Sequence, residues 1–274
     1  RAGGNIEFGP HVFLTSGPLV ISNKRSITCW GQGWLNETII QQHANFGAGH
    51  YVFEIGSASD AVVLQGFEFY NMQIRGDRAA YSVGGGMSVY CSLGVFHDLG
   101  IQNVTDTAFY FNGPSATVTA YTNAVDRLHI SGFGRSGAHT AHGIFIDQYV
   151  SDSDVLNSDV HQDNEAENNT TGSHGFYIRA GTSRLFNNHA YFCYDYGYYF
   201  DYAGNTTILD CIAESNGLEG LFINGPDGVK LIGGGYYSNG QRGAATANNI
   251  YIANSSRFSI AALHMRKERN TTVN

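Results

Sequence analysis

Ionisable and aromatic side chains recur at matching positions in the second half of this chain. Four segments align: LNSDVHQD, FNNHAYFC, LDCIAESN and IGGGYYSN, which begin at residues 156, 186, 209 and 232. One aligned position holds Asp159 and His189, and the position two residues later holds His161, Tyr191 and Glu214. If the segments stack as neighbouring strands, carboxylates, imidazoles and phenols gather on one surface.

Such a surface has the groups that glycosidic cleavage needs. Hydrolysis uses one protonated carboxyl as acid and one carboxylate as base, while aromatic rings hold the sugars. A lyase would instead use His161, Tyr191 or Arg184 on the proton at C5 of a uronate. The expected catalytic residues are Asp159, Asp210, Glu214 and His161, and the expected substrate-binding residues here are His189, Tyr191 and Tyr237. The alternative to a catalytic site is that these residues are ordinary polar side chains on the solvent-exposed face of a sheet.

A second set of residues follows a repeated Gly-aromatic pattern. In HGIFIDQ, HGFYIRA, YGYYFDY and EGLFING, which begin at 142, 174, 196 and 219, the middle apolar residue should point outward. The expected outward row is Tyr110, Phe145, Tyr177, Tyr199, Phe222 and Tyr251. A continuous apolar stripe suits a sugar groove, a subunit contact or cover by the chain's own insertions.

Beside that row lie Asp147, Arg179 and Asp201, counted as further substrate-binding candidates. The two carboxylates would stand about 9.6 Å apart by strand spacing, near the separation of an inverting glycosidase. The favoured interpretation is a charge ladder in which Arg179 neutralises the two carboxylates. A neighbouring guanidinium lowers the pKa of a carboxyl group, whereas a general acid must keep its proton.

The sequence predicts no metal site and no cofactor, although Ca²⁺ is possible. Asp163, Glu165 and Glu167 in the insertion at 161–175 offer oxygen ligands, but without EF-hand spacing. His139 and His142 lie three apart in an expected loop, where that spacing means little.

The elements that would position these residues are short strands. First apolar residues of the units recur with a basic period of about 22–23 residues plus insertions, and no helical period is present. Each unit holds two or three strands joined by Gly/Asn turns, typical of coils stacked in parallel. The predicted fold class is all-β, a single-stranded right-handed parallel β-helix. The predicted inward ladder is Phe109/Phe111, Ile144/Ile146, Phe176/Ile178, Tyr198/Phe200, Leu221/Ile223 and Ile250/Ile252.

Composition agrees with a strand-rich solenoid. Charged residues are only 14% of 274, against 35 Gly, 17 Tyr and 17 Phe. A net charge of −8 disfavours nucleic acid, and no apolar run is long enough for membrane insertion. The four cysteines show no metal-binding spacing, so buried single thiols are expected.

One domain should span 1–274, with first coils in 1–48, main coils in 49–264 and a tail in 265–274. A chain that opens at Arg1 without Met is expected to be processed or part of a longer protein.

The segment GGNIEFGPHVFLTSGPLVISNKRSITCWGQGWLNETII, which ends at residue 40, resembles the first coils of the pectate-lyase-like β-helix superfamily. The hallmark motifs of polygalacturonases and the Asp-Pro-His of alginate epimerases are missing. The resemblance therefore implies a polysaccharide-binding and glycan-cleaving shaft of the bacteriophage tailspike type, a homotrimer located on a virion or outside cells. The alternatives are a monomeric secreted lyase or hydrolase acting on acidic glycans, and a non-catalytic virion spike or adhesin.

Overall fold

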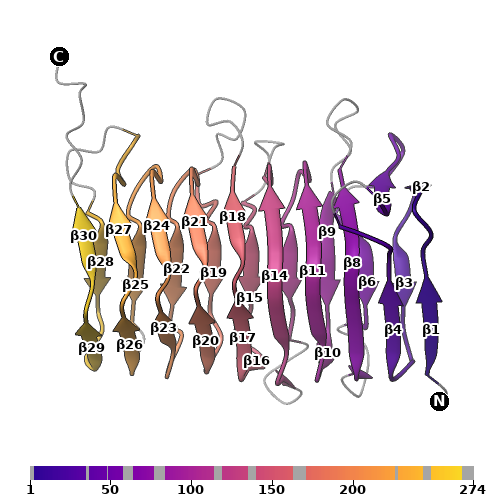
Figure 1. The fold of residues 1–274 in the computed structure, drawn as a ribbon. Coiled ribbons are helices and arrows are strands. Elements are labelled where there is room, and N and C mark those ends of the chain that lie inside the picture. The colour runs from indigo at the N-terminus through magenta and orange to yellow at the C-terminus, as the bar shows by residue number, and fades with distance from the viewer. Residues whose placement is uncertain are drawn as a thin grey trace.

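The computed structural model describes residues 3–34, 37–47, 49–57, 64–76, 84–113, 119–134, 140–162, 171–225, 228–242 and 248–266. These residues contain thirty strands and no helix, so no described helix could span a membrane. All strand pairings are parallel and join successive coils, which confirms the predicted parallel β-helix. Two large sheets form the front and back layers of the solenoid in Figure 1.

The back layer is a nine-stranded sheet, called sheet B here. Its strands are β3 (Leu19–Ile21), β6 (His50–Ile55), β9 (Gly84–Val89), β12 (Phe109–Phe111), β15 (Ile144–Ile146), β19 (Phe176–Ile178), β22 (Tyr198–Asp201), β25 (Leu221–Asn224) and β28 (Ile250–Ala253). From β12 onward the first and third residues of these strands fill the core, as the inward ladder predicts. Only Ile250 and Ile252, in the last coil, are partly buried.

The front layer, sheet A, has seventeen strands. In the first half of the chain these are β1 (Gly4–Glu7), β2 (Val12–Thr15), β4 (Ile27–Trp30), β5 (Ile39–Gln42), β8 (Phe67–Arg75), β11 (Val95–Gln102) and β14 (Ala124–Ser131). In the second half they come in pairs: β17 (Ser153–Leu156) with β18 (Asp159–His161), β20 (Ser183–Phe186) with β21 (His189–Tyr191), β23 (Thr207–Leu209) with β24 (Ile212–Glu214), β26 (Val229–Ile232) with β27 (Gly235–Tyr237), and β29 (Phe258–Ala261) with β30 (His264–Arg266).

Two short pairs complete the strands. These are β7 (Leu64–Gln65) with β10 (Cys91–Ser92), and β13 (Ala120–Tyr121) with β16 (Val150–Ser151).

A left-handed residue divides sheet A along its length. Asn157, Asn187, Asp210 and Gly233 have φ near +50° to +65° and separate the paired strands of successive coils. Asn, Asp and Gly tolerate this conformation better than other residues, which explains their recurrence at one aligned position. The chain bends there, so the residues before and after the bend form two separate rows of side chains.

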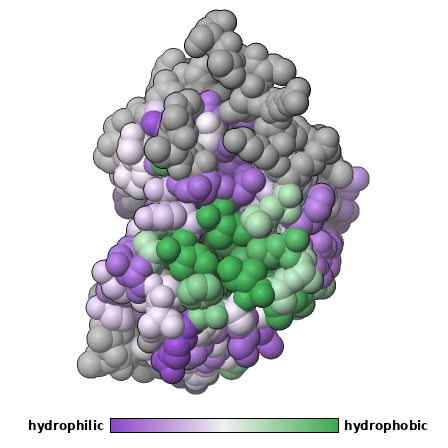
Figure 2. All heavy atoms as spheres, turned by 90° about the vertical axis from the view of Figure 1, so that its left-hand side faces the viewer, coloured by the Kyte–Doolittle hydropathy of each residue, from purple (hydrophilic) through white to green (hydrophobic). Residues whose placement is uncertain are grey.

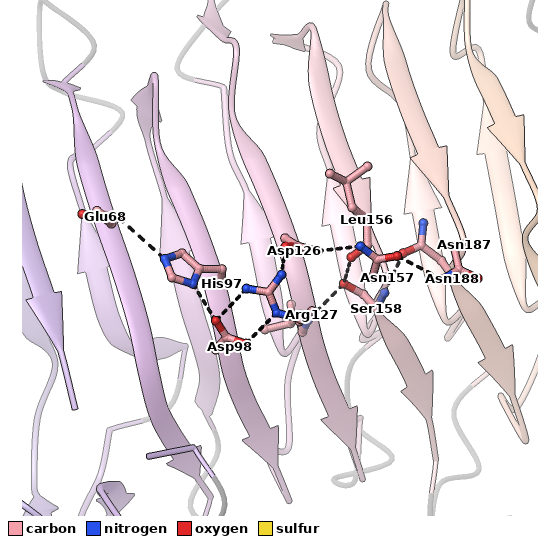
Figure 3. Close-up of polar contacts among 11 residues, drawn as sticks. Glu68, His97, Asp98, Asp126, Arg127, Leu156, Asn157, Ser158, Asn187 and Asn188 are labelled. Atoms are coloured by element: carbon pink, nitrogen blue, oxygen red, sulfur yellow. Dashed lines mark hydrogen bonds and ion pairs between the residues drawn. The ribbon is translucent and has the colours of Figure 1, made fainter. Parts of the chain in front are cut away.

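A polar ladder runs along this bend (Figure 3). Arg127 binds both carboxylate oxygens of Asp98 at 2.7 Å and also contacts Asp126, which accepts a hydrogen bond from Asn157 at 2.8 Å. Asn187 then donates to Asn157 at 3.0 Å. The Arg127 guanidinium lowers the pKa of Asp98 to about 2. The ladder links successive coils outside the core.

The solenoid ends in an apolar surface. Figure 2 views the C-terminal end, where a green patch faces the viewer. Phe258, Ile260 and Met265 are 50%, 45% and 60% exposed there, and Ile252 and Leu263 are partly buried beside them. These positions point into the core in earlier coils. In the last coil, no further coil among the described residues covers them.

Candidate functional site

The second half of sheet A brings the sequence-predicted ionisable residues together in the expected register. Asp159 pairs with His189, and His161 pairs with Tyr191, at facing positions of β18 and β21. Tyr191 in turn faces Glu214 on β24, which faces Tyr237 on β27. All of these side chains are half-buried. The predicted stacking of these rows is confirmed.

His129 on β14 completes this surface. It faces Asp159, and its Nδ1 lies 2.6 Å from Oδ1 of the Asp159 carboxylate. Its ring centroid lies 5.6 Å from that of His161. The alignment of the internal repeats did not predict a role for this residue, although the segment VDRLHISG at 125–132 belongs to the same repeat. Extending the aligned position back by one coil would have placed His129 beside Asp159.

A second histidine–carboxylate contact lies on the next coils. His189 Nε2 is 3.1 Å from Glu214 Oε1, although the contact lacks the alignment of a hydrogen bond. Tyr191 lies between the imidazoles, with its ring centroid 4.6 Å from His161 and 4.5 Å from His189. We call His129, Asp159, His161, His189, Tyr191 and Glu214 the sheet A cluster.

Trp34 borders this cluster and was also missed by sequence analysis. Its ring centroid lies 5.9 Å from that of His129. The side chain lies over Gly100 of β11, where an added Cβ would be in ordinary van der Waals contact with Trp34 Cε3 at 3.6 Å. Trp34 comes from the first coils, so only tertiary structure brings it to residues of β14.

The structure does not bring Asp210 into the cluster. Asp210 is exposed at the bend between β23 and β24, in the row of Asn157 and Asn187. Its Oδ1 leans over Gly233 of the following coil, where an added Cβ would be 2.0 Å away. The carboxylate is directed away from the coil of His189, so the expectation that Asp210 and Asp159 act together is corrected. Arg184 is likewise engaged elsewhere, with two hydrogen bonds to Asp154.

Sheet B carries the other predicted set on the opposite outward surface. The six aromatic residues of the predicted row pair coil to coil in one file, hereafter the aromatic file. Neighbouring ring centroids in this file are 4.6–5.3 Å apart, and the rings are stacked. Because each ring face meets the next ring, the edges are left for solvent. Tyr177 and Tyr199 therefore lack the open ring face that would stack on a sugar.

The predicted charge ladder lies beside the aromatic file. Arg179 stands between Asp147 at 3.6 Å and Asp201 at 3.9 Å. The Tyr177 hydroxyl donates a hydrogen bond to Asp201 at 3.1 Å, and the Tyr110 hydroxyl donates a hydrogen bond to Asp147 at the same distance. Burial raises the pKa of both Tyr177 and Tyr110. These phenols stay neutral, and their carboxylate partners are occupied by hydrogen bonds and Arg179.

Two histidines and the cysteines belong to the interior. His142 and His174 are buried with ring centroids 5.2 Å apart, and burial lowers the pKa of His142 to about 3. His139, the other member of the sequence pair, lies outside the described residues. The four cysteines are free and buried, as predicted. Asp163, Glu165 and Glu167 also lie outside the described residues.

By sequence the chain matches no known family profile and no curated protein. Its fold is similar to several solved structures. The A-module of the mannuronan C-5 epimerase AlgE6 from Azotobacter vinelandii matches with a TM-score of 0.63 and 12% identity, over 98% of this chain and 79% of that one. ORF18 of Geobacillus virus E2 matches with a TM-score of 0.66 and 15% identity, over 95% of this chain and 54% of that one.

Tailspike protein 2 of the Escherichia coli O157:H7 bacteriophage CAB120 matches with a TM-score of 0.61 and 12% identity, over 95% of this chain and 38% of that one. The chain thus spans about half or less of these two viral proteins. At such identities the similarity establishes the fold alone, which is a right-handed parallel β-helix.

Proposed function

We propose that the protein binds a polysaccharide along the outward surface of sheet A and cleaves it at the sheet A cluster. The observation that carries this proposal is the pair of histidine–carboxylate contacts, His129–Asp159 and His189–Glu214, on a surface where Tyr191 packs against both His161 and His189. Rigid parallel strands hold all six side chains, and sites built on strands are more precisely ordered than sites on loops. Trp34 and Tyr237 lie on either side, where they would contact further sugar units.

The contacts favour one type of cleavage. Hydrolysis needs a protonated carboxyl facing a carboxylate across an open space. Here Asp159 contacts His129 and Glu214 contacts His189 instead, which is the arrangement of a histidine base oriented by a carboxylate. We therefore favour elimination at a uronate over hydrolysis.

In this reaction His189, oriented by Glu214, takes the proton from C5 of the uronate. The electron pair forms the C4–C5 double bond, and the C4–O bond breaks. The departing oxygen takes its proton from the Tyr191 hydroxyl. The products are an unsaturated uronate and a free hydroxyl on the other fragment.

The structural similarities support the substrate class. One similar structure is named as a mannuronan C-5 epimerase and another as a phage tailspike. Tailspike-type action on a bacterial surface polysaccharide remains our leading proposal for the biological role, with a location on a virion or outside cells. We also propose a homotrimer, in which the aromatic file contributes to the subunit contact.

Incubation with capsular, O-antigen, alginate and pectin polysaccharides tests this function. We expect shortened chains from one class and ultraviolet absorbance from the unsaturated uronate. Glu214→Gln and Tyr191→Phe should each lower the rate by about 10²–10⁴-fold, because each removes a group that orients or transfers a proton. Asp210→Asn is the matched control, since its carboxylate lies outside the cluster, and it should keep the rate within a few fold.

The other outcomes distinguish the rivals. Shortened chains without the unsaturated product indicate a hydrolase, and binding without shortening indicates a non-catalytic spike. Full activity in Glu214→Gln and Tyr191→Phe would show that the sheet A cluster is not the site of cleavage.

A further inference from the structure

Three side chains of the sheet A cluster converge in a way that acid–base chemistry does not require. His129, Asp159 and His161 each offer one ligand atom, and these atoms lie within 4.8 Å of one another. The residues come from two neighbouring strands, β14 and β18, and are half-buried. We infer that these three residues form a binding site for a late divalent transition metal such as Zn²⁺.

The donor set selects this class of ion. Two imidazole nitrogens and one carboxylate oxygen are the ligands of many zinc sites that keep an open position. Calcium and magnesium prefer oxygen ligands alone, so they should bind this group poorly. The site therefore differs from the Ca²⁺ possibility that the acidic insertion raised.

The backbone register already places the ligands. His129 and Asp159 face each other on adjacent strands, which are separated by about 4.8 Å. His161 lies two residues beyond Asp159 on the same outward surface. Side chains two apart on one strand point the same way, so all three reach one point above the sheet.

Only small side-chain movements are needed to close the site. Bond lengths of about 2.1 Å place tetrahedral ligand atoms about 3.4 Å apart. The His129–Asp159 contact of 2.6 Å would open slightly, and His161 would approach from within 4.8 Å. Trp34 packs on His129 and Tyr191 stacks on His161, so the two imidazoles are already restrained.

The site opens toward the surface where the polysaccharide is proposed to lie. Three protein ligands leave a fourth position for water or for an oxygen of a bound saccharide. The proposed base and acid, His189 and Tyr191, are not among the ligands. This inference deepens the proposed function, but the metal site itself does not depend on it.

Titration of the intact chain, without a histidine tag and after dialysis against a chelator, tests the inference. We expect calorimetry with ZnCl₂ to show one saturable site, and Co²⁺ to give the visible absorption of a low-coordinate nitrogen–oxygen complex. CaCl₂ should give no comparable binding. His129→Gln and His161→Gln should each weaken Zn²⁺ binding by at least the 10–100-fold typical of lost supporting groups.

His97→Gln is the matched control. His97 forms a similar contact with Asp98 at 2.7 Å on the same sheet, but no second imidazole joins it among the described residues. Its loss should leave Zn²⁺ affinity unchanged, and far-ultraviolet circular dichroism should show that every variant folds. Equal Zn²⁺ affinity in the wild-type chain and His161→Gln would overturn the inference, as would the absence of saturable binding.

Metal binding and polysaccharide cleavage are measured separately, so their failures can be told apart. A chain that binds Zn²⁺ through His129 and His161 but cleaves no polysaccharide supports the metal site and removes the proposed reaction. A chain that cleaves uronate polymers without binding Zn²⁺ supports the proposed reaction and removes the metal site, which leaves His129–Asp159 as a histidine–carboxylate contact only.

Discussion

Histidines in this protein serve two purposes that depend on which side of the sheets they occupy. His129, His161 and His189 point outward and meet carboxylates or aromatic rings. His142 and His174 are buried and stacked, and burial lowers the pKa of both. The interior pair must remain neutral for the coils to pack, which ties folding to pH.

We expect acid to destabilise the protein through this interior pair. The unfolded chain takes up protons near pH 6.5, while His142 in the folded chain stays neutral down to about pH 3. The unfolded state therefore binds more protons as the pH falls, and stability declines by up to about 1.4 kcal/mol per pH unit for each histidine. Denaturant unfolding between pH 7 and pH 4 measures this slope.

His142→Gln should reduce the slope by up to about 1.4 kcal/mol per pH unit, the contribution of one proton. An identical slope in His142→Gln and the wild-type chain would show that the pair does not control acid stability.

At the scale of elements, a glycine precedes the sheet B strands β15, β19, β22 and β25, because the coils approach too closely there for a side chain. A Cβ on Gly175 would lie 2.7 Å from the Gly197 carbonyl oxygen and 2.8 Å from Cys193 Sγ. A Cβ on Gly197 would meet the Gly220 carbonyl oxygen at 2.8 Å. The repeated Gly-aromatic pattern is thus a requirement of coil spacing.

Gly175→Ala should accordingly cost about 1–3 kcal/mol of unfolding free energy, because overpacking forces the neighbouring coil to move. Gly181→Ala is the matched control: nothing lies within 4 Å of its added Cβ, and its φ is not in the left-handed region. That variant should be neutral or more stable by up to about 1 kcal/mol. Comparable losses in both variants would contradict a role for coil spacing.

At the scale of the whole molecule, the aromatic file forms one continuous row along the outward surface of sheet B. Its rings stack on one another and present a row of edges, and Tyr251 at its end is 47% exposed. Protein side chains pack against ring edges readily, whereas sugars prefer ring faces. The file therefore suits a subunit contact better than a glycan groove.

Light scattering after size exclusion should accordingly give three times the chain mass. A double variant, Tyr199→Asp with Tyr251→Asp, should shift the mass toward the monomer, since each change buries a charge at the contact. Tyr202→Asn, on a side chain that is 72% exposed directly after β22, should leave the trimer intact. A wild-type chain that is monomeric at high concentration would refute the trimer.

The sequence by itself determined the repeat, and through it the fold, the inward ladder, the aromatic file and the register of Asp159, His161, His189, Tyr191 and Glu214. These features are periodic because each coil packs on the preceding coil with the same geometry and therefore needs similar residues at equivalent positions. Simple alternation then tells which side chains face the core.

The tertiary structure alone decided which members of each row touch. Asp210 shares the repeat with Glu214, yet a left-handed bend directs its carboxylate over Gly233 and away from the cluster. Trp34 reaches His129 from the first coils, with its side chain over Gly100 of β11. Side-chain direction at a bend and long-range packing depend on local backbone geometry and distant partners, and the repeat period carries no information about either.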